Sequence, residues 1–193
     1  MVQYKKNIQT LLNAYLNKSR DAQKTVAIFE LEELFLALLE IRKSGANLFL
    51  AGNGGSASTC QHFAVDLGIG GIDRNSIIRS INLSDNQSAI TAVANDRDFE
   101  NIFSAQLSIL GKPSDGLLVI SASGNSQNLI NVVKEARKLG MKTLALLGFD
   151  GGKLREICDH SILVTTDKGE YGVVEDIHLS ICHNLTEALR QTK

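Results

Sequence analysis

The amino-acid sequence predicts an α/β fold in which a parallel sheet is covered by helices on both faces. Short apolar runs alternate with longer segments whose apolar residues recur every three or four positions, the pattern of strands alternating with helices. Runs such as NLFLAG (47–52) and GLLVISAS (116–123) are almost continuously apolar, which is typical of strands buried on both faces. Two of these runs end in glycine turns, GNGGS (52–56) and SASGNS (121–126), that lead into helices.

The composition is that of a globular protein. Of the 193 residues, 44% are hydrophobic and 21% are charged, which excludes the disordered and fibrous classes. We expect one domain over residues 1–193, with an N-terminal helical pair at 1–44 and an α/β core at 45–193. The net charge of −1 gives no sequence-wide reason to expect nucleic acid or an anionic membrane as a partner.

The sequence contains neither an apolar targeting or membrane-spanning stretch nor a CxxC motif, and these absences indicate the cellular compartment and the state of the cysteines. No stretch approaches the roughly 18 consecutive apolar residues that cross a bilayer, and the N-terminus has no uninterrupted apolar region of the signal-peptide kind. We therefore expect a cytoplasmic protein. The cysteines are scattered and lack CxxC spacing, so we expect buried free thiols at Cys60, Cys158 and Cys182.

The expected elements follow one another in a regular order. Two N-terminal helices are expected at 3–18 and 22–43, and the second is apolar on more than one face, so we expect this pair to pack against another subunit. A loop is expected at 67–76. Strands are expected at 47–52, 77–83, 116–123, 143–147 and 160–165. The remaining helices are expected at 55–67, 87–95, 99–110, 128–139, 154–158 and 173–190.

The two glycine turns are candidate anion sites. Ligands of open parallel sheets bind beyond the carboxyl ends of the strands, and both turns lie at such ends. The second turn offers several hydroxyls beside the free N–H groups of a helix N-terminus, which suits phosphate. A plain serine-capped turn has the same composition. GNGGS lacks both the GxGxxG and the GK[ST] patterns, so no nucleotide cofactor is expected.

Histidines and carboxylates on two helices form a second candidate cluster. His62 and Asp66 are four residues apart on one helix face, a pair that is also common as a surface ion pair. The final helix carries Glu175, Asp176, His178 and His183, and either carboxylate lies about two turns from His183. Brought together, two histidines and two carboxylates suit zinc or another divalent cation, or serve as general base and acid.

Five ordered segments resemble the SIS (sugar isomerase) family, and within it the phosphoheptose isomerases. They are GNGGSASTCQHFAVDL (52–67), SAITAVANDRDFENIFSAQ (88–106), SASGNSQNLINVV (121–133), GFDGGKL (148–154) and VEDIHLSICH (174–183). The resemblance covers nearly the whole chain. It implies a three-layer αβα sandwich with a five-stranded parallel sheet, usually in a homotetramer. It also implies an aldose–ketose isomerase that interconverts sedoheptulose 7-phosphate and glycero-manno-heptose 7-phosphate for lipopolysaccharide or capsule synthesis.

The resemblance also implies roles for single residues. The family's base stands at Asp66 and its acid at His183. Metal-bearing members hold zinc at positions corresponding to His62, Asp66, Glu175 and His183. Residues implied to contact the sugar phosphate are Asn53, Gly54, Ser56, Asp96, Ser121, Ser123, Asn125, Ser126 and Glu175.

Three departures from the phosphoheptose isomerase pattern bear on the substrate. Asp66 replaces a glutamate, which draws the carboxylate back by roughly 1.5 Å. Glu175-Asp176 replaces Gln-Glu and adds a charge. YGVVED replaces TARIQE and removes an arginine and a threonine from the mouth of the site, while Ala122 replaces a threonine of the second turn. Two alternatives therefore stay open: a non-catalytic SIS module that binds a sugar phosphate or a partner protein, as in replication-initiator-associating proteins, and an isomerase or epimerase of another phosphosugar.

Overall fold

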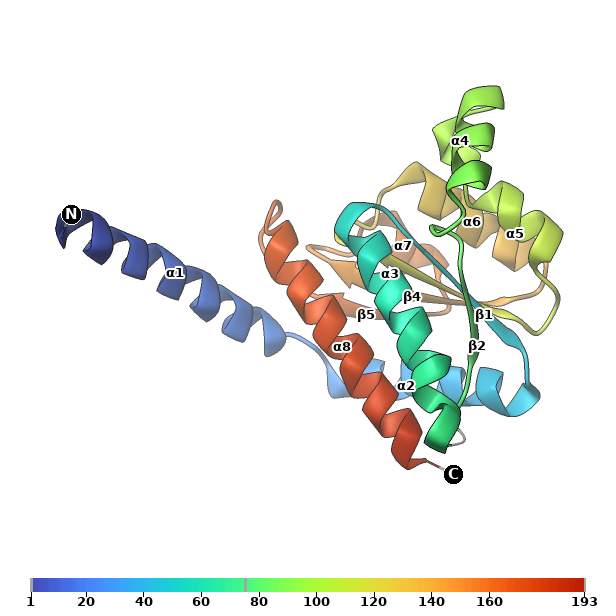
Figure 1. The fold of residues 1–193 in the computed structure, drawn as a ribbon, viewed down its shortest axis with the longest axis horizontal. Helices are drawn as coiled ribbons and strands as arrows, with labels where there is room; N and C mark the ends of the chain where they lie inside the picture. Colours follow the sequence, from blue (N-terminus) through green and yellow to red (C-terminus); the bar gives the residue numbers. More distant parts are fainter. Residues whose placement is uncertain (1, 75, 193) are drawn as a thin grey trace.

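The computed structural model describes residues 2–74 and 76–192, and it confirms the five-stranded parallel sheet with helices on both faces (Figure 1). The strands lie in the order β2-β1-β3-β4-β5, and all four neighbouring pairs are parallel. The order reverses between β1 and β3, where ligand sites of such sheets form. The strands are Asn47–Gly52 (β1), Arg79–Asn82 (β2), Gly116–Ser121 (β3), Lys142–Gly148 (β4) and His160–Val164 (β5).

The helices agree with the expected order and differ in some boundaries. The α-helices are Val2–Gln23 (α1), Ile28–Ser44 (α2), Gly54–Leu67 (α3), Gln87–Asp96 (α4), Ser104–Leu110 (α5), Gln127–Lys138 (α6), Gly152–Ile157 (α7) and Tyr171–Gln191 (α8). Two 3-10 helices are Ile69–Arg74 (η1) and Phe99–Asn101 (η2). The expected loop at 67–76 thus contains η1, and its residue 75 lies outside the described residues.

Two expected helices needed correction. The helix expected at 22–43 begins at Ile28, because the backbone N–H groups of Lys24 and Thr25 bond three residues back and close a turn. The helix expected at 99–110 is broken into η2 and α5. There Ser104 Oγ donates to Asn101 Oδ1 at 3.0 Å, and such local side-chain bonds compete with regular helix formation.

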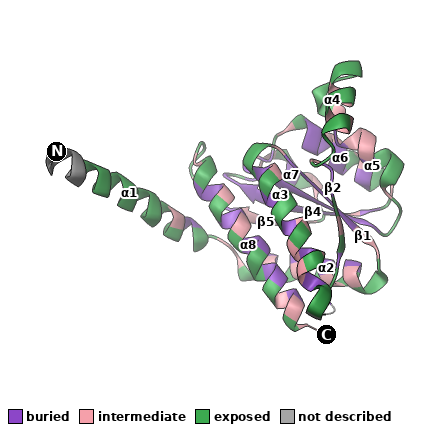
Figure 2. Ribbon diagram, viewed as in Figure 1, coloured by how far each residue is buried: buried purple, intermediate pink, exposed green. Residues whose placement is uncertain are grey.

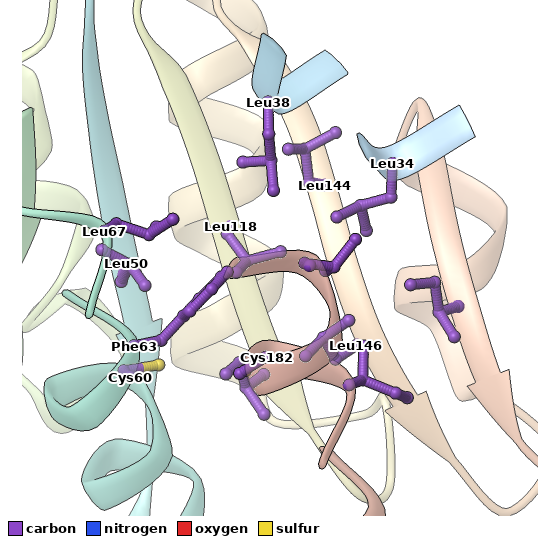
Figure 3. Packing of buried hydrophobic residues seen from close by; sticks show 14 of the residues in the cluster. Leu34, Leu38, Leu50, Cys60, Phe63, Leu67, Leu118, Leu144, Leu146 and Cys182 are labelled. Carbon is purple, nitrogen blue, oxygen red and sulfur yellow. The ribbon is translucent and has the colours of Figure 1, made fainter. Parts of the chain in front are cut away.

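Each face of the sheet carries its own apolar core. Alternate residues of β1 point to opposite faces, so Leu50 packs with α2, α3 and α8, while Phe49 packs with α5, α6 and α7. Figure 3 shows the first of these cores, in which Leu50, Leu118 and Leu146 of the strands meet Phe63 of α3 and Leu34 of α2. This packing places α3 beside α8 on one face of the sheet (Figure 1).

The three cysteines are free thiols in the structure. Cys60 and Cys182 are buried in the first core, as expected, whereas Cys158 is only partly buried. Burial raises the pKa of the Cys158 thiol to about 12 and raises the pKa values of the other two well above the usual range. All three thiols therefore remain protonated near neutral pH and serve as apolar packing groups.

Helix α1 projects away from the sandwich (Figure 1), and most of its described residues are exposed (Figure 2). Its apolar stripe, Ile8, Leu11, Leu12, Tyr15 and Leu16, is among these exposed residues. Leu11 and Leu12 are 64% and 62% exposed, and Ile8 and Leu16 are similar. The C-terminal part of α1 contacts α8, where Tyr15 Oη donates to Asp176 Oδ2 at 2.7 Å. No helix among the described residues is long and apolar enough to cross a membrane.

Candidate active site

The turns after β1 and β3 are joined by a pair of amide side chains. Asn53 Nδ2 donates to Asn128 Oδ1 at 3.0 Å, and Asn128 Nδ2 donates to Asn53 Oδ1 at 2.9 Å. Asn128 is 3% exposed, so the reciprocal pair satisfies a buried amide that would otherwise be costly. The pair fixes the spacing of the two glycine turns at the point where the strand order reverses.

The β3–α6 turn folds around Gly124, and its serine hydroxyls accept hydrogen bonds from its own backbone N–H groups. Ser121 Oγ accepts from the N–H of Gly124 at 3.0 Å, and Ser123 Oγ accepts from the N–H of Asn125 at 3.3 Å. The hydroxyls of Ser121, Ser123 and Ser126 thus lie beside the start of α6, whose N-terminus carries partial positive charge. This combination favours an anion.

The β3–α6 turn is also locked against the β4–α7 turn. Gly124 has a φ of +63°, and a Cβ there would lie 1.9 Å from the carbonyl oxygen of Gly151, so this position requires glycine. Two hydrogen bonds join the turns: the N–H of Lys153 donates to Asn125 Oδ1 and the N–H of Leu154 donates to the Gly124 carbonyl, both at 3.0 Å. Contacts with the neighbouring turn therefore hold this candidate anion-binding turn in place.

A pocket of about 110 Å³ opens between the turns that follow β1 and β3 and the first turn of α8. Six of the residues expected to contact a sugar phosphate line it. They are Asn53, Ser56, Ser121, Ser123, Ser126 and Glu175, together with Ile120, Ala122, Leu129 and Tyr171. The aromatic residue of this lining, Tyr171, is not among the residues that the sequence predicted to contact the sugar phosphate.

Three expected contact residues lie outside this pocket. Gly54 is the first residue of α3, with a φ of +53° that allows the sharp entry into the helix. Asn125 lines a neighbouring hollow of about 190 Å³ on the other side of the turn. Asp96 is exposed at the end of α4, where its carboxylate accepts from Asn95 Nδ2.

Pocket size alone does not identify the site. A hollow of about 400 Å³ lies at the amino ends of β3, β4 and β5, lined by Ser114, Lys142 and Asp159 among others. Ligand sites of parallel sheets form at the carboxyl ends of the strands, where the smaller pocket lies.

Glu175 reaches from α8 to the first turn of α3. A Cβ at Gly55 would lie 2.2 Å from Glu175 Oε2, so only glycine at this position lets the carboxylate approach. Burial raises the pKa of Glu175, and the neighbouring Asp176 charge raises it further. The carboxyl group is therefore protonated more readily than a solvated glutamate.

Three of the four residues expected at a metal come together where α3 and α8 pack. Ligand atoms of His62, Asp66 and His183 all lie within 4.8 Å of one another. The two Nε2 atoms are 3.2 Å apart, and Asp66 Oδ2 lies 3.5 Å from His62 Nε2 and 3.8 Å from His183 Nε2. Nε2 atoms this close allow one ring to donate a hydrogen bond to the other, and the tautomers decide which ring donates.

The fourth expected ligand, Glu175, is not in this group of described residues. It precedes His183 by eight residues, which is roughly 12 Å along a helix axis. His178 is also outside the cluster, because it is fully buried in the packed face of α8. Burial lowers its pKa to about 4. His178 is therefore a neutral core residue and not a member of the exposed cluster.

Comparison with known proteins identifies the fold. Residues 3–148 match the family model described as the SIS domain. The chain is an SIS-domain protein. This SIS domain is 38% identical over 155 residues to a phosphoheptose isomerase of Helicobacter pylori (strain P12), with 80% of this chain and 79% of that protein covered. It is 37% identical over 180 residues to a phosphoheptose isomerase of Trichlorobacter lovleyi, with 91% and 87% covered.

Solved structures agree with these relatives. The SIS domain superposes on a phosphoheptose isomerase from Neisseria gonorrhoeae with a TM-score of 0.86 at 26% identity, covering 98% of this chain and 100% of that one. A phosphoheptose isomerase from Francisella tularensis gives the same TM-score at 28% identity, with 97% and 98% covered. Within the SIS family the protein is therefore phosphoheptose isomerase-like, as its sequence motifs indicated.

The amide pair between the turns leads to a stability prediction. Asn128→Ala removes both hydrogen bonds and leaves a void, so we expect the free energy of unfolding to fall by about 2 kcal/mol. Asn131→Ala on the same helix removes a more exposed asparagine, and we expect it to cost less than about 1 kcal/mol. Urea unfolding of both variants measures the difference, and equal losses would show that the amide pair contributes nothing special.

Proposed function

We propose that this protein is an aldose–ketose isomerase that converts sedoheptulose 7-phosphate into glycero-manno-heptose 7-phosphate, in the cytoplasmic synthesis of surface heptoses. One observation carries the proposal. The two helices that bound the serine-lined pocket, α3 and α8, also bring Asp66 and His183 to within 3.8 Å. The phosphoheptose isomerase names of its relatives support the same reaction. In this proposal residues 1–193 form one SIS domain.

The binding step uses groups that are already in place. The phosphate lies in the β3–α6 turn, where the hydroxyls of Ser121, Ser123 and Ser126 and the N-terminus of α6 supply donors and positive potential. Asn53 and Ser56 face the open-chain sugar. Phosphate binding far from the reacting carbons provides binding energy that orients the chain for reaction.

The chemical step is a proton transfer between neighbouring carbons. Asp66 removes the proton from the carbon beside the carbonyl, while His183 donates a proton to the carbonyl oxygen, which gives an enediol. The proton then returns to the former carbonyl carbon, and the adjacent hydroxyl gives up its proton as the new carbonyl forms. The separation of 3.8 Å between Asp66 Oδ2 and His183 Nε2 suits two groups acting on adjacent atoms.

The exchange of substrate protons tests this function directly. Wild-type protein in deuterated water should incorporate deuterium beside the carbonyl of sedoheptulose 7-phosphate, with zinc supplied. We expect Asp66→Asn to slow exchange by about a hundredfold or more while phosphate affinity stays unchanged. Asp73→Asn, which removes an exposed carboxylate from η1, is the matched control.

Two outcomes would count against this proposal. Retained exchange in Asp66→Asn would reject Asp66 as the base. The absence of exchange by the wild type with every pentose, hexose and heptose phosphate tested would overturn the isomerase and favour a module that only binds sugar phosphates.

The donor set of His62, Asp66 and His183 fits a catalytic zinc ion. Such sites use three protein ligands and keep a fourth position open, and two imidazoles with one carboxylate are suitable donors. Zinc bound there would polarise substrate oxygens as a Lewis acid, in place of the proton that His183 donates in the metal-free enzyme, because a zinc-bound Nε2 carries no proton. Glu175, the fourth ligand implied by family resemblance, lines the pocket instead and is suited to hold a sugar hydroxyl.

Metal analysis separates the zinc proposal from the reaction. We expect the wild type to bind about one zinc per chain and His62→Ala to lose most of that affinity. His160→Ala removes a histidine outside the cluster and should leave binding intact. Equal zinc content in all three proteins would reject the proposed ligands.

A homotetramer is proposed as the working form of the protein. The exposed apolar stripe of α1 needs a partner, and the pocket of about 110 Å³ is smaller than the roughly 300 Å³ at the low end of ligand sites. A neighbouring copy would cover the stripe and complete the site, and Asp96, which lies outside its own chain's pocket, would contribute to a neighbour's site.

Sedimentation measures the assembly. We expect the wild type to sediment as a tetramer, and Leu12→Glu to dissociate it because a charge replaces a 62% exposed leucine in the proposed interface. Gln9→Glu adds the same charge at an exposed polar position of α1 and should change little. A wild type that is a stable monomer at micromolar concentration contradicts the assembly without bearing on the chemistry.

A further inference from the structure

Tyr171 occupies the place where α8 meets the pocket. It is the first residue of α8, it lines the pocket with Ser123 and Glu175, and it remains 51% exposed. Glu175 follows it by four residues, so the two side chains project from one face of the helix. Much of the tyrosine ring is therefore free to contact a ligand in the pocket.

The ring is supported from the sheet side by Phe149. The two rings pack edge to face, with centroids 5.1 Å apart and an interplanar angle of 80°, the arrangement that aromatic quadrupoles favour. Phe149 is 5% exposed and has a φ of +55°, a conformation that costs a residue other than glycine about 1 kcal/mol or more. Such strain persists where the surrounding structure fixes the residue, so Phe149 gives Tyr171 a rigid support.

The backbone on both sides of Tyr171 is held by α1. Lys18 forms an ion pair with Glu170, the residue before the tyrosine. On the other side, a Cβ at Gly172 would lie 3.1 Å from Tyr15 Oη, so the α1 tyrosine packs directly on the glycine backbone. The first turn of α8 is thus fixed from two directions, and the ring of Tyr171 is positioned before substrate binds.

The chemistry of the ring suits the carbon chain and not the phosphate. The negative face of an aromatic ring attracts the weakly positive C–H groups of a sugar and repels an anion. Its hydroxyl can exchange hydrogen bonds with sugar hydroxyls. Tyr171 lines the same pocket as Ser123 of the proposed phosphate turn and Glu175, so its ring can contact the carbons of a sugar whose phosphate lies in that turn.

We propose that Tyr171 is a substrate-positioning and specificity-determining residue, whose ring forms the wall against which the carbon chain of a phosphorylated ketose lies. This inference rests on the proposed isomerase function. A longer chain places more carbons against the wall, so the ring favours a heptulose phosphate over a pentulose phosphate. The support by Phe149 makes the preference depend on both aromatic residues.

The test compares kcat/KM for sedoheptulose 7-phosphate and ribulose 5-phosphate in the wild type, Tyr171→Ala and Tyr171→Phe. We expect Tyr171→Ala to lower kcat/KM about tenfold for the heptulose and less than about threefold for the pentulose. Tyr171→Phe should keep most of the preference because it keeps the ring. Inhibition by inorganic phosphate should be unchanged, since the phosphate turn is intact.

Matched variants guard against a merely structural effect. Phe99→Ala removes an aromatic residue that is 58% exposed on η2 and should leave the substrate ratio unchanged. Phe149→Leu should lower the ratio in the same direction as Tyr171→Ala, because the ring loses its support. If Tyr171→Ala unfolds early in a thermal scan, Tyr171→Leu replaces it. An unchanged ratio, or an equal fall for both substrates that Tyr171→Phe does not restore, would overturn the proposal.

Calorimetry keeps this test independent of turnover. If the wild type turns over neither sugar, its assignment as a sedoheptulose 7-phosphate isomerase fails, and the same variants are compared by their Kd for sedoheptulose 7-phosphate and for ribulose 5-phosphate. A larger loss of heptulose affinity in Tyr171→Ala, restored in Tyr171→Phe, still supports the wall. Equal affinities in the wild type and Tyr171→Ala would reject it.

Discussion

The contact between α3 and α8 is the constraint on which both parts of the site depend. At one end of this contact the Glu175 carboxylate lies against Gly55, where a Cβ would displace it. Further along, the same contact brings Asp66 and His62 of one helix to His183 of the other. Both helices are anchored by burying Phe63, Cys60 and Cys182 against the sheet (Figure 3). The apolar core therefore fixes the distance between the proposed phosphate turn and the cluster of His62, Asp66 and His183.

The three histidines of α3 and α8 differ in their exposure to solvent. His178, one turn further along α8 than Glu175, is enclosed in the core, and burial keeps it neutral. The side chains of His62 and His183 are about half exposed, at 48% and 52%, so water or a substrate can reach their ring nitrogens. His178 and His183 of one helix thus differ in exposure because the helix turns their side chains in different directions.

The sequence predicts strands, helices and turns well because their patterns are local. It does not predict contacts between side chains that are far apart in the sequence. The apolar runs predicted all five strands, and the glycines and serines that follow two of them predicted the two turns. The contacts of Asn128 and Tyr171 were not predicted, because their partners, Asn53 and Phe149, are 75 and 22 positions away in the sequence and no periodicity links them. Glu175 was expected beside His183 because helical period gives the shared face of two residues. The helical period does not predict which residue of a neighbouring helix each of these side chains contacts.

Helix α1 connects the outer surface of the molecule to the pocket. Its apolar stripe has no partner within the described chain, yet its C-terminal part holds the turn that carries Tyr171 and Glu175. The hydrogen bond to Asp176 raises the pKa of Tyr15 to about 12, so the tyrosine stays protonated and keeps donating well above neutral pH. A partner that orders α1 would therefore also fix the first turn of α8. In the proposed oligomer, one helix would thus serve both assembly and the positioning of Tyr171 in the pocket.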